Sequence, residues 1–262
     1  MASKQLKGGI ACRVEGSGPP LVLIHGGMGS WTHWVRNIPV LKEHFTVYAP
    51  DMPGHGDSIG VPLDISVDDY MAIVCGAIDE IAQGSRIDLC GFSFGTSVSS
   101  LITARMPHTI ARLALLAPAA LGRLVPNRPM DQKRMPGKDA PEEAKREVLR
   151  HNLLTFMLAH PESIDEETLR IQRENAARTR YDSRRFSFGT HTRDALPYFK
   201  CPVMGIFGEL DNFAWPSIWA KVIPCRSIKM DMRLEVVPRA GHWVQYEAAD
   251  AVNALLLDFF RS

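Results

Sequence analysis

The sequence predicts an α/β protein in which helices flank a doubly wound, mostly parallel sheet and a helical lid is inserted late in the chain. Short, continuous apolar runs, such as residues 21–24 and 203–207, are typical of strands buried on both faces of a parallel sheet. Stretches with apolar residues at helical spacing separate these runs. The alternation stops over residues 120–199, where no strand pattern occurs. We therefore expect a core made of residues 1–119 and 200–262, interrupted by the lid.

Composition excludes several classes of protein. The chain has 262 residues, 45% of them hydrophobic and 23% charged, which is typical of a globular protein with one large or two small domains. A formal net charge of +1 gives no electrostatic footprint for nucleic acid. The five cysteines are odd in number and contain no Cys-x-x-Cys pair, which argues against a disulfide framework or a zinc site. They are Cys12, Cys75, Cys90, Cys201 and Cys225.

The amino-terminal segment and the apolar runs bear on location. The first nine residues lack an apolar signal core, and no apolar run approaches the ~18 residues of a membrane span. Scattered, unpaired cysteines favour a reducing compartment. We expect a cytoplasmic protein that binds neither membrane nor nucleic acid.

The elements before the central motif follow from local patterns. The apolar runs that predict strands are residues 10–14 (a short edge strand), 21–24 and 45–49. Ser30 can cap a helix that runs to about Leu41, and Ser66 with Asp69 resembles a capping box that opens another helix. The glycine-rich loop over residues 25–29 does not fit the Gly-x-Gly-x-x-Gly spacing, so nucleotide binding is only weakly indicated.

A Gly-x-Ser-x-Gly motif centred on Ser93 joins an apolar run to a helical pattern. Such a turn is so sharp that its central residue adopts a strained backbone and exposes its hydroxyl. Gly91 and Gly95 leave room where a Cβ would strike the neighbouring strand or helix. The Phe94 N–H lies at a helix start, where it is free to bind an anion.

The remaining elements complete the alternation around the lid. Strands are predicted at residues 113–117, 203–207 and 234–237, and helices at residues 142–159, 163–178, 217–222 and 248–260. Within the lid, Pro126, Pro129, Pro136 and Pro141 mark an irregular loop. Ser163 with Glu166 is a candidate capping box for the second lid helix.

Three residues that together make a nucleophilic site stand just past three separate strands. They are Ser93, Asp211 and His242. Because the carboxyl ends of parallel strands share one edge of the sheet, these side chains can converge. Serine needs a base to take its proton, histidine is that base near neutral pH, and a carboxylate fixes the tautomer of the histidine.

The chain order Ser…Asp…His, with the nucleophile on a strand–helix elbow, resembles the α/β-hydrolase family. The matching segments cover essentially the whole chain: residues 25–27 (HGG), 51–56 (DMPGHG), 91–95 (GFSFG), 208–211 (GELD) and 241–242 (GH). The resemblance implies an oxyanion hole made by the backbone N–H groups of Phe94 and Gly27, with Met28 as the alternative to Gly27. It implies no metal or cofactor. His25 and His55 are expected to be structural.

The resemblance also implies where substrate binds. The lid is expected to cover the strand ends and to line an apolar acyl pocket, with Phe92, Trp243 and Phe156 in contact with substrate. The four arginines of the lid, which more often form a solvated face, could instead attract an anionic substrate. They are Arg178, Arg180, Arg184 and Arg185.

Three functions remain open on this fold, and each has a small-molecule ligand. The first is a serine hydrolase that cleaves a small or medium carboxylic ester, thioester or lactone. The second is a carbon–carbon hydrolase of the meta-cleavage-product type, although that branch carries asparagine where this chain has Phe92. The third is a ligand receptor or pseudo-enzyme, and lyase or perhydrolase activity is also compatible with the fold. A homodimer is possible with any of them.

Overall fold

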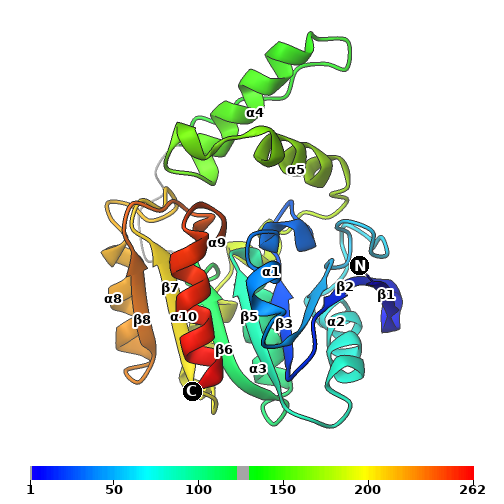
Figure 1. Ribbon diagram of the computed structural model, residues 1–262, viewed down its shortest axis with the longest axis vertical. Coiled ribbons are helices and arrows are strands. Elements are labelled where there is room, and N and C mark those ends of the chain that lie inside the picture. Colours follow the sequence, from blue (N-terminus) through cyan, green and yellow to red (C-terminus); the bar gives the residue numbers. More distant parts are fainter. Residues whose placement is uncertain (1, 123–129) are drawn as a thin grey trace.

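A computed structural model describes residues 2–122 and 130–262. Within this part of the chain an eight-stranded sheet has the order β1-β2-β4-β3-β5-β6-β7-β8 (Figure 1). The strands are β1 (Ala2–Leu6), β2 (Ile10–Glu15), β3 (Pro20–Ile24), β4 (Thr46–Pro50), β5 (Ile87–Phe92), β6 (Ile110–Leu116), β7 (Val203–Gly208) and β8 (Arg233–Val237). Strand β2 pairs antiparallel with β1 and β4, and all pairs from β4 to β8 are parallel. The mostly parallel sheet is therefore confirmed.

The sheet is covered on both faces, and this explains its continuous apolar runs. Along β3, Val22 and Ile24 pack into one core cluster with helices α2 (Val67–Ala82), α3 (Phe94–Arg105) and α8 (Trp219–Ile228). Leu21 and Leu23 point the other way and pack with α1 (Ile38–Leu41) and α10 (Ala249–Arg261). Because successive side chains of a strand alternate between faces, a strand covered on both sides must be apolar at every position.

Two local predictions near the amino terminus are wrong. Strand β2 is not the edge, because β1 pairs with it and the short 3₁₀ turn η1 (Lys7–Gly9) connects the two. The helix expected from Ser30 to Leu41 is broken into a 3₁₀ turn, η2 (Trp31–Trp34), and the short helix α1. Pro39 lies in the first turn of α1, and its ring is tolerated there but not in the middle of a helix. Ser30 does cap η2 by accepting the Thr32 N–H.

The segment after β6 leaves the sheet and forms two protruding helices, α4 (Glu142–Phe156) and α5 (Glu166–Ala177), joined through the turn η3 (Pro161–Ser163) (Figure 1). The chain then returns through α6 (Arg184–Ser187), α7 (His191–Ala195) and η4 (Leu196–Tyr198), and both α6 and α7 contact α3. Pro126 and Pro129 of the predicted loop lie outside the described residues. We use "lid" below for α4, η3 and α5.

The predicted cap of the second lid helix is wrong by two residues. Asp165, not Ser163, precedes α5, and its carboxylate accepts the Thr168 N–H at 2.8 Å. The Thr168 side chain in turn accepts from the Asp165 N–H, which completes a capping box. Ser163 instead ends η3, where its hydroxyl donates to Glu247.

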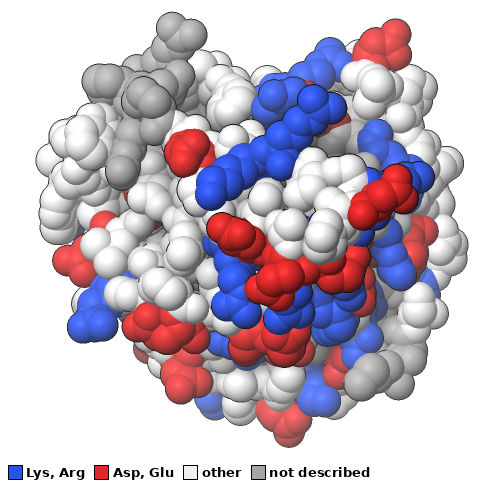
Figure 2. Space-filling model, turned by 90° about the horizontal axis from the view of Figure 1, so that it is seen from above, with Lys and Arg blue, Asp and Glu red and all other residues white. Residues whose placement is uncertain are grey.

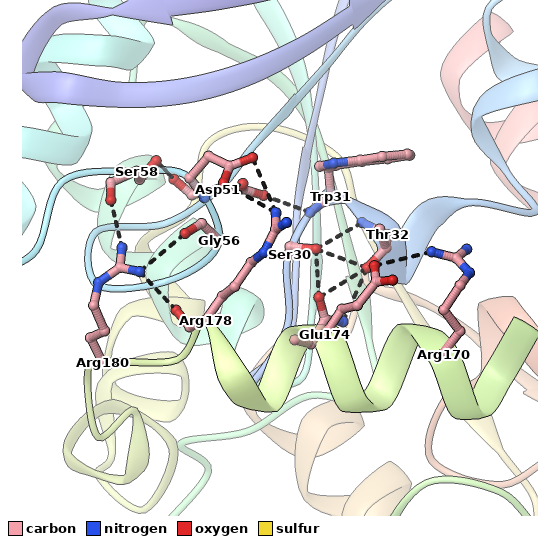
Figure 3. A network of polar contacts seen from close by, with 12 residues as sticks. Ser30, Trp31, Thr32, Asp51, Gly56, Ser58, Arg170, Glu174, Arg178 and Arg180 are labelled. Carbon is pink, nitrogen blue, oxygen red and sulfur yellow. Dashed lines mark hydrogen bonds and ion pairs between the residues drawn. The ribbon is translucent and has the colours of Figure 1, made fainter.

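The carboxyl half of α5 is bonded to two loops of the core (Figure 3). Asn175 is 3% exposed and accepts the Ser30 hydroxyl at 2.7 Å, while its amide donates to the Thr32 hydroxyl at 3.0 Å. Beyond the helix end, Arg178 pairs with Asp57 at 3.1 Å. The lid is thus held to the loops that follow β3 and β4.

The outer face of the lid carries both signs of charge. Seen from above, blue and red residues lie interspersed there rather than in one patch (Figure 2). Arg146 of α4 pairs with Glu166 of α5, and Arg170 pairs with Glu174 at 3.0 Å. Exposed pairs of this kind contribute only ~0–1 kcal/mol each. Among the helices of residues 2–122 and 130–262, none is long and apolar enough to span a bilayer.

Two glycine-to-alanine substitutions test the packing at the Ser93 turn. A Cβ at Gly95 would lie 2.4 Å from the Ile24 carbonyl oxygen, whereas a Cβ at Gly76, inside α2, meets nothing within 4 Å. We expect Gly95→Ala to lower the free energy of unfolding by about 3 kcal/mol or more, because backbone must move. Gly76→Ala should raise it by ~0.5–1 kcal/mol through helix propensity. Urea unfolding measures both, and equal effects would contradict this packing.

Candidate active site

Ser93 occupies the tight turn between β5 and α3. Its φ of 51° lies in the left-handed region that few non-glycine residues adopt. The turn holds it there: the Ser93 N–H donates to the Leu116 carbonyl at 2.9 Å, and the Ser93 carbonyl accepts from the Thr96 N–H at 2.8 Å. A Cβ at Gly91 would lie 2.5 Å from the Gly95 carbonyl oxygen, so strand and helix approach too closely for any larger residue. The strained backbone leaves the Ser93 side chain partly exposed.

The structure brings together the three side chains expected to form the site. Ser93 Oγ lies 2.8 Å from His242 Nε2, and His242 Nδ1 lies 3.0 Å from Asp211 Oδ2. They come from the loops after β5, β7 and β8. With Asp211 as an acceptor, the proton of a neutral His242 is on Nδ1, and Nε2 is left to accept the Ser93 hydroxyl proton.

The environment of Asp211 keeps it ionised. Burial alone would raise the pKa of this carboxyl, but the charges of His242 and Lys221 and hydrogen bonds from His242 and the Phe213 N–H hold the pKa well below its ordinary value. Asp211 Oδ1 accepts the Phe213 N–H at 2.8 Å, and Lys221 Nζ lies 3.5 Å from Oδ2. Glu209, two residues earlier, accepts the Arg239 N–H instead and takes no part in this network.

Two backbone N–H groups near Ser93 have no hydrogen-bond acceptor within residues 2–122 and 130–262. Phe94 is the first residue of α3, so its N–H has no intrahelical acceptor, and the Gly27 N–H has no partner among the described residues. A Cβ on Gly27 would lie 3.7 Å from the Phe94 Cβ, which places the two residues side by side. Met28 has a φ of 50° and is 48% exposed, so its side chain borders solvent. The sequence-predicted donors therefore lie together.

Buried histidines fix the loop that carries Gly27. His25 Nε2 accepts the Met52 N–H at 2.8 Å, which leaves Nδ1 to donate to the Gly26 carbonyl at 2.7 Å. His33 Nδ1 accepts the Gly26 N–H at 3.1 Å. Burial lowers the pKa of His33 to about 3 and that of His55 to about 4, so both stay neutral. His55 Nδ1 lies 3.2 Å from the Pro53 carbonyl, so His25 and His55 both hydrogen-bond to loop backbone, as predicted.

The predicted substrate contacts of Phe92 and Trp243 need correction, because both side chains are fully buried. The Phe92 ring packs between His33 and His242, at centroid distances of 5.5 and 5.3 Å. Trp243 donates its indole N–H to the His33 carbonyl at 3.0 Å. Phe92 thus contacts His242 from the core side, whereas the Trp243 ring, just before α9 (Val244–Glu247), packs on His33 and Tyr246 at centroid distances of 4.9 and 4.1 Å.

Two other aromatic side chains face the site. The Phe213 ring lies 4.6 Å from the His242 ring and is 37% exposed. Phe156, at the end of α4, stacks on Phe213 at 6.0 Å and is partly exposed. Phe156 was predicted from the sequence, whereas Phe213 was not, although it stands only two residues after Asp211.

The four arginines that follow α5 are bound to the protein itself. Besides the Arg178–Asp57 pair, Arg180 donates to the Gly56 and Ser58 carbonyls (Figure 3). Arg184 pairs with Asp182, and Arg185 donates to the Leu63 and Ile65 carbonyls. Arg178, Arg180 and Arg185 therefore tie the chain after α5 to the core loops, whereas Arg184 pairs within its own segment.

One carboxylate links the lid to the histidine loop. Glu247, at the end of α9, accepts the N–H groups of Ala159 and His160 at 3.0 Å each and the Ser163 hydroxyl at 2.9 Å. It also accepts the Gly241 N–H at 2.7 Å, next to His242. The sequence analysis missed this residue because three of its four partners lie more than 80 residues away in the sequence.

The described residues show no grouping of three or more His, Cys, Asp or Glu side chains suited to hold a metal ion. The chemistry that this part of the chain offers is that of a nucleophile, a base, a carboxylate and two N–H donors. A strand–turn–helix nucleophile followed by Asp and His on later loops of the same sheet is the arrangement of the α/β-hydrolase fold.

Comparison with known proteins identifies the same fold family. The model of the alpha/beta hydrolase family matches residues 21–255, so the chain belongs to that family. It is 30% identical over 258 residues to the dihydrolipoyllysine-residue acetyltransferase component of the acetoin cleaving system of Pseudomonas putida, covering 93% of this chain but 64% of that protein. The chain thus spans less than two thirds of that relative.

Two further proteins are similar over most of their length. The 2-hydroxy-6-oxo-6-phenylhexa-2,4-dienoate hydrolase of Burkholderia cepacia is 27% identical over 260 residues, which is 93% of this chain and 88% of that protein. The crystal structure of naproxen esterase from Bacillus subtilis superposes with a TM-score of 0.75 at 21% identity, covering 99% of this chain and 91% of that one. At that identity the structural likeness concerns the fold.

Replacing Glu247 tests the link between lid and histidine loop. Glu247→Ala leaves three N–H groups and one hydroxyl without their acceptor, so we expect the free energy of unfolding to fall by about 2–4 kcal/mol. The matched control is Glu162→Ala, because Glu162 is exposed and only approaches His160 at 3.8 Å. Urea unfolding should separate the two variants by at least about 1.5 kcal/mol, and indistinguishable midpoints would contradict the assigned role.

Proposed function

We propose that this protein is a serine hydrolase that cleaves a small or medium carboxylic ester, thioester or lactone through an acyl-enzyme. The observation that carries the proposal is the continuous chain from Ser93 Oγ through His242 to Asp211, beside the free Phe94 N–H. All the groups that acyl transfer requires are present at one edge of the sheet.

The reaction follows from the positions of these groups. Ser93 Oγ attacks the substrate carbonyl carbon while His242 Nε2 takes the hydroxyl proton. The N–H groups of Phe94 and Gly27 donate to the resulting oxyanion, and each such donor contributes ~3–4 kcal/mol to transition-state stabilisation. The leaving alcohol or thiol takes the proton from His242, and the acyl group stays on Ser93. Water then repeats the sequence, releasing the carboxylic acid and restoring the free serine.

The surroundings of Ser93 support an apolar acyl group. Met28 and Phe213 are exposed beside the site, and Phe156 of the lid stacks on Phe213. The four predicted lid arginines are engaged by carboxylates and carbonyls of the protein. An uncharged ester does not require a further cation in the site in order to bind.

A second candidate is the carbon–carbon hydrolase, favoured by the likeness to the Burkholderia cepacia enzyme. That branch carries asparagine before the serine and uses a lid arginine, and both help to bind the anionic dienolate. Here the position holds Phe92, fully buried and without a polar group. A buried anion would lose ~1–3 kcal/mol for each missing hydrogen bond. An ester requires neither group, so we rank ester hydrolysis first.

Substitutions in the site test the mechanism. Ser93→Ala and His242→Ala should each lower kcat by about 10³-fold or more, because nucleophile or base is lost. Asp211→Asn should lower it somewhat less, since it disturbs the tautomer of His242 and leaves the base in place. Steady-state hydrolysis of p-nitrophenyl esters measures this, with circular dichroism to show an intact fold. Activity of Ser93→Ala within tenfold of wild type would exclude the mechanism.

A substrate comparison decides between the two candidates. We expect kcat/KM for p-nitrophenyl or alkyl esters to be well above kcat/KM for 2-hydroxy-6-oxo-dienoates. Efficient dienoate cleavage by the wild type with negligible esterase activity would reverse the ranking.

A further inference from the structure

A lysine outside the expected Ser–His–Asp set reaches the buried carboxylate of the site. Lys221 Nζ lies 3.5 Å from Asp211 Oδ2, the same oxygen that faces His242 Nδ1 at 3.0 Å. The Lys221 side chain is 13% exposed and that of Asp211 is 0% exposed. Among the described residues, Asp211 is the only carboxylate within 4 Å of this ammonium group. One carboxylate oxygen is thus shared by an imidazole and a lysine.

The position of Lys221 is fixed by the fold. It belongs to α8, whose residues Val222 and Cys225 are buried in the core, and its ammonium also lies 6.0 Å from the Phe213 ring centroid. Removing a lysine from water is costly unless a negative charge compensates, and Asp211 supplies that charge. Asp211 already receives hydrogen bonds from Phe213 and His242, so the distinct contribution of Lys221 is its positive charge.

The other charged groups around the histidine do not duplicate this effect. His33, on η2, is neutral because burial lowers its pKa to about 3. Glu247, on α9, faces the Gly241 N–H and the lid, and Glu209 faces the Arg239 N–H. Among the described residues, Lys221 is therefore the cation that faces the Asp211–His242 pair from a packed helix.

The sign of its effect on catalysis follows. The negative charge of a triad carboxylate stabilises the positive charge that the histidine acquires. A cation on the same oxygen offsets part of that stabilisation, so the charge of Lys221 favours the neutral, basic form of the imidazole over the imidazolium. The same cation keeps Asp211 ionised in spite of its burial.

We propose that Lys221 is a positioning residue of the active site that extends serine-hydrolase activity toward acidic pH by sharing Asp211 with His242. The proposal rests on the proposed function. It assigns Lys221 no contact with substrate and no part in proton transfer.

The test compares pH profiles of wild type and Lys221→Met. Removing the charge should move the acid limb of the kcat/KM profile for a p-nitrophenyl ester to higher pH by about one pH unit. A shift of this size is expected from a partly screened charge as close to Asp211 as Lys221 is. On that limb the variant should therefore lose about tenfold in rate relative to wild type. Lys221→Arg should restore the limb, because it keeps the charge. A limb that stays in place or moves downward in Lys221→Met overturns the proposal.

A matched control separates charge from packing. Lys229, at the other end of α8, is similarly buried and pairs with Asp231, away from Ser93. Lys229→Met should lower thermal stability without moving the acid limb, and an equal shift in both variants would overturn the proposal. Lys221→Gln should show the same shift as Lys221→Met, and it decides the test if the methionine variant does not fold.

The effect of Lys221 on the pH profile is also measured without an ester substrate. The rate at which a fluorophosphonate modifies Ser93, followed by mass spectrometry over the same pH range, depends on the base and should show the same displacement. Modification of Ser93 without ester turnover in wild type would contradict the proposed function, and the labelling profiles would still decide the role of Lys221. No modification of Ser93 in wild type would overturn both.

Discussion

The active site depends on the close approach of strand and helix around Ser93. The backbone of this residue has a φ of 51°, and the turn tolerates it because Gly91 and Gly95 let β5, α3 and the end of β3 come into contact. The carbonyl groups of Ile24 and His25 lie where a Cβ on Gly95 would be. Ser93 and the loop that carries Gly27 are therefore positioned by the same contact.

The lid and the histidine loop are coupled in a comparable way. Glu247 accepts hydrogen bonds from both. The backbone N–H of Trp243 also donates to the Met157 carbonyl, at the end of α4, at 2.7 Å. At the other end of the lid, the Asn175 side chain forms hydrogen bonds with Ser30 and Thr32 in the loop after β3. The lid is thus attached beside His242 and beside the loop that carries Gly27.

Sequence reasoning predicted the features that depend on local chemistry and chain order. Strands β2 to β8, the Ser93 turn and the convergence of Asp211 and His242 follow from apolar runs, glycine spacing and parallel topology, whereas β1 was not predicted. It failed where long-range packing decides. The burial of Phe92 and Trp243 results from packing of the core around His33. The sequence gives no sign that Lys221 approaches Asp211, because that contact depends on where α8 packs. The break before α1 follows from Pro39, whose ring is tolerated in the first turn of a helix but not in its middle.

The central claim is that Ser93 carries the acyl group during turnover, and trapping that intermediate tests it most directly. The protein is mixed with p-nitrophenyl acetate, quenched in acid within the first turnovers, digested and analysed by peptide mass spectrometry. The account predicts acetylation of Ser93 that forms at the rate of the initial p-nitrophenol burst and disappears as the ester is consumed. Turnover with no acylated Ser93, or with the acetyl group carried on another residue at a kinetically competent rate, would contradict it.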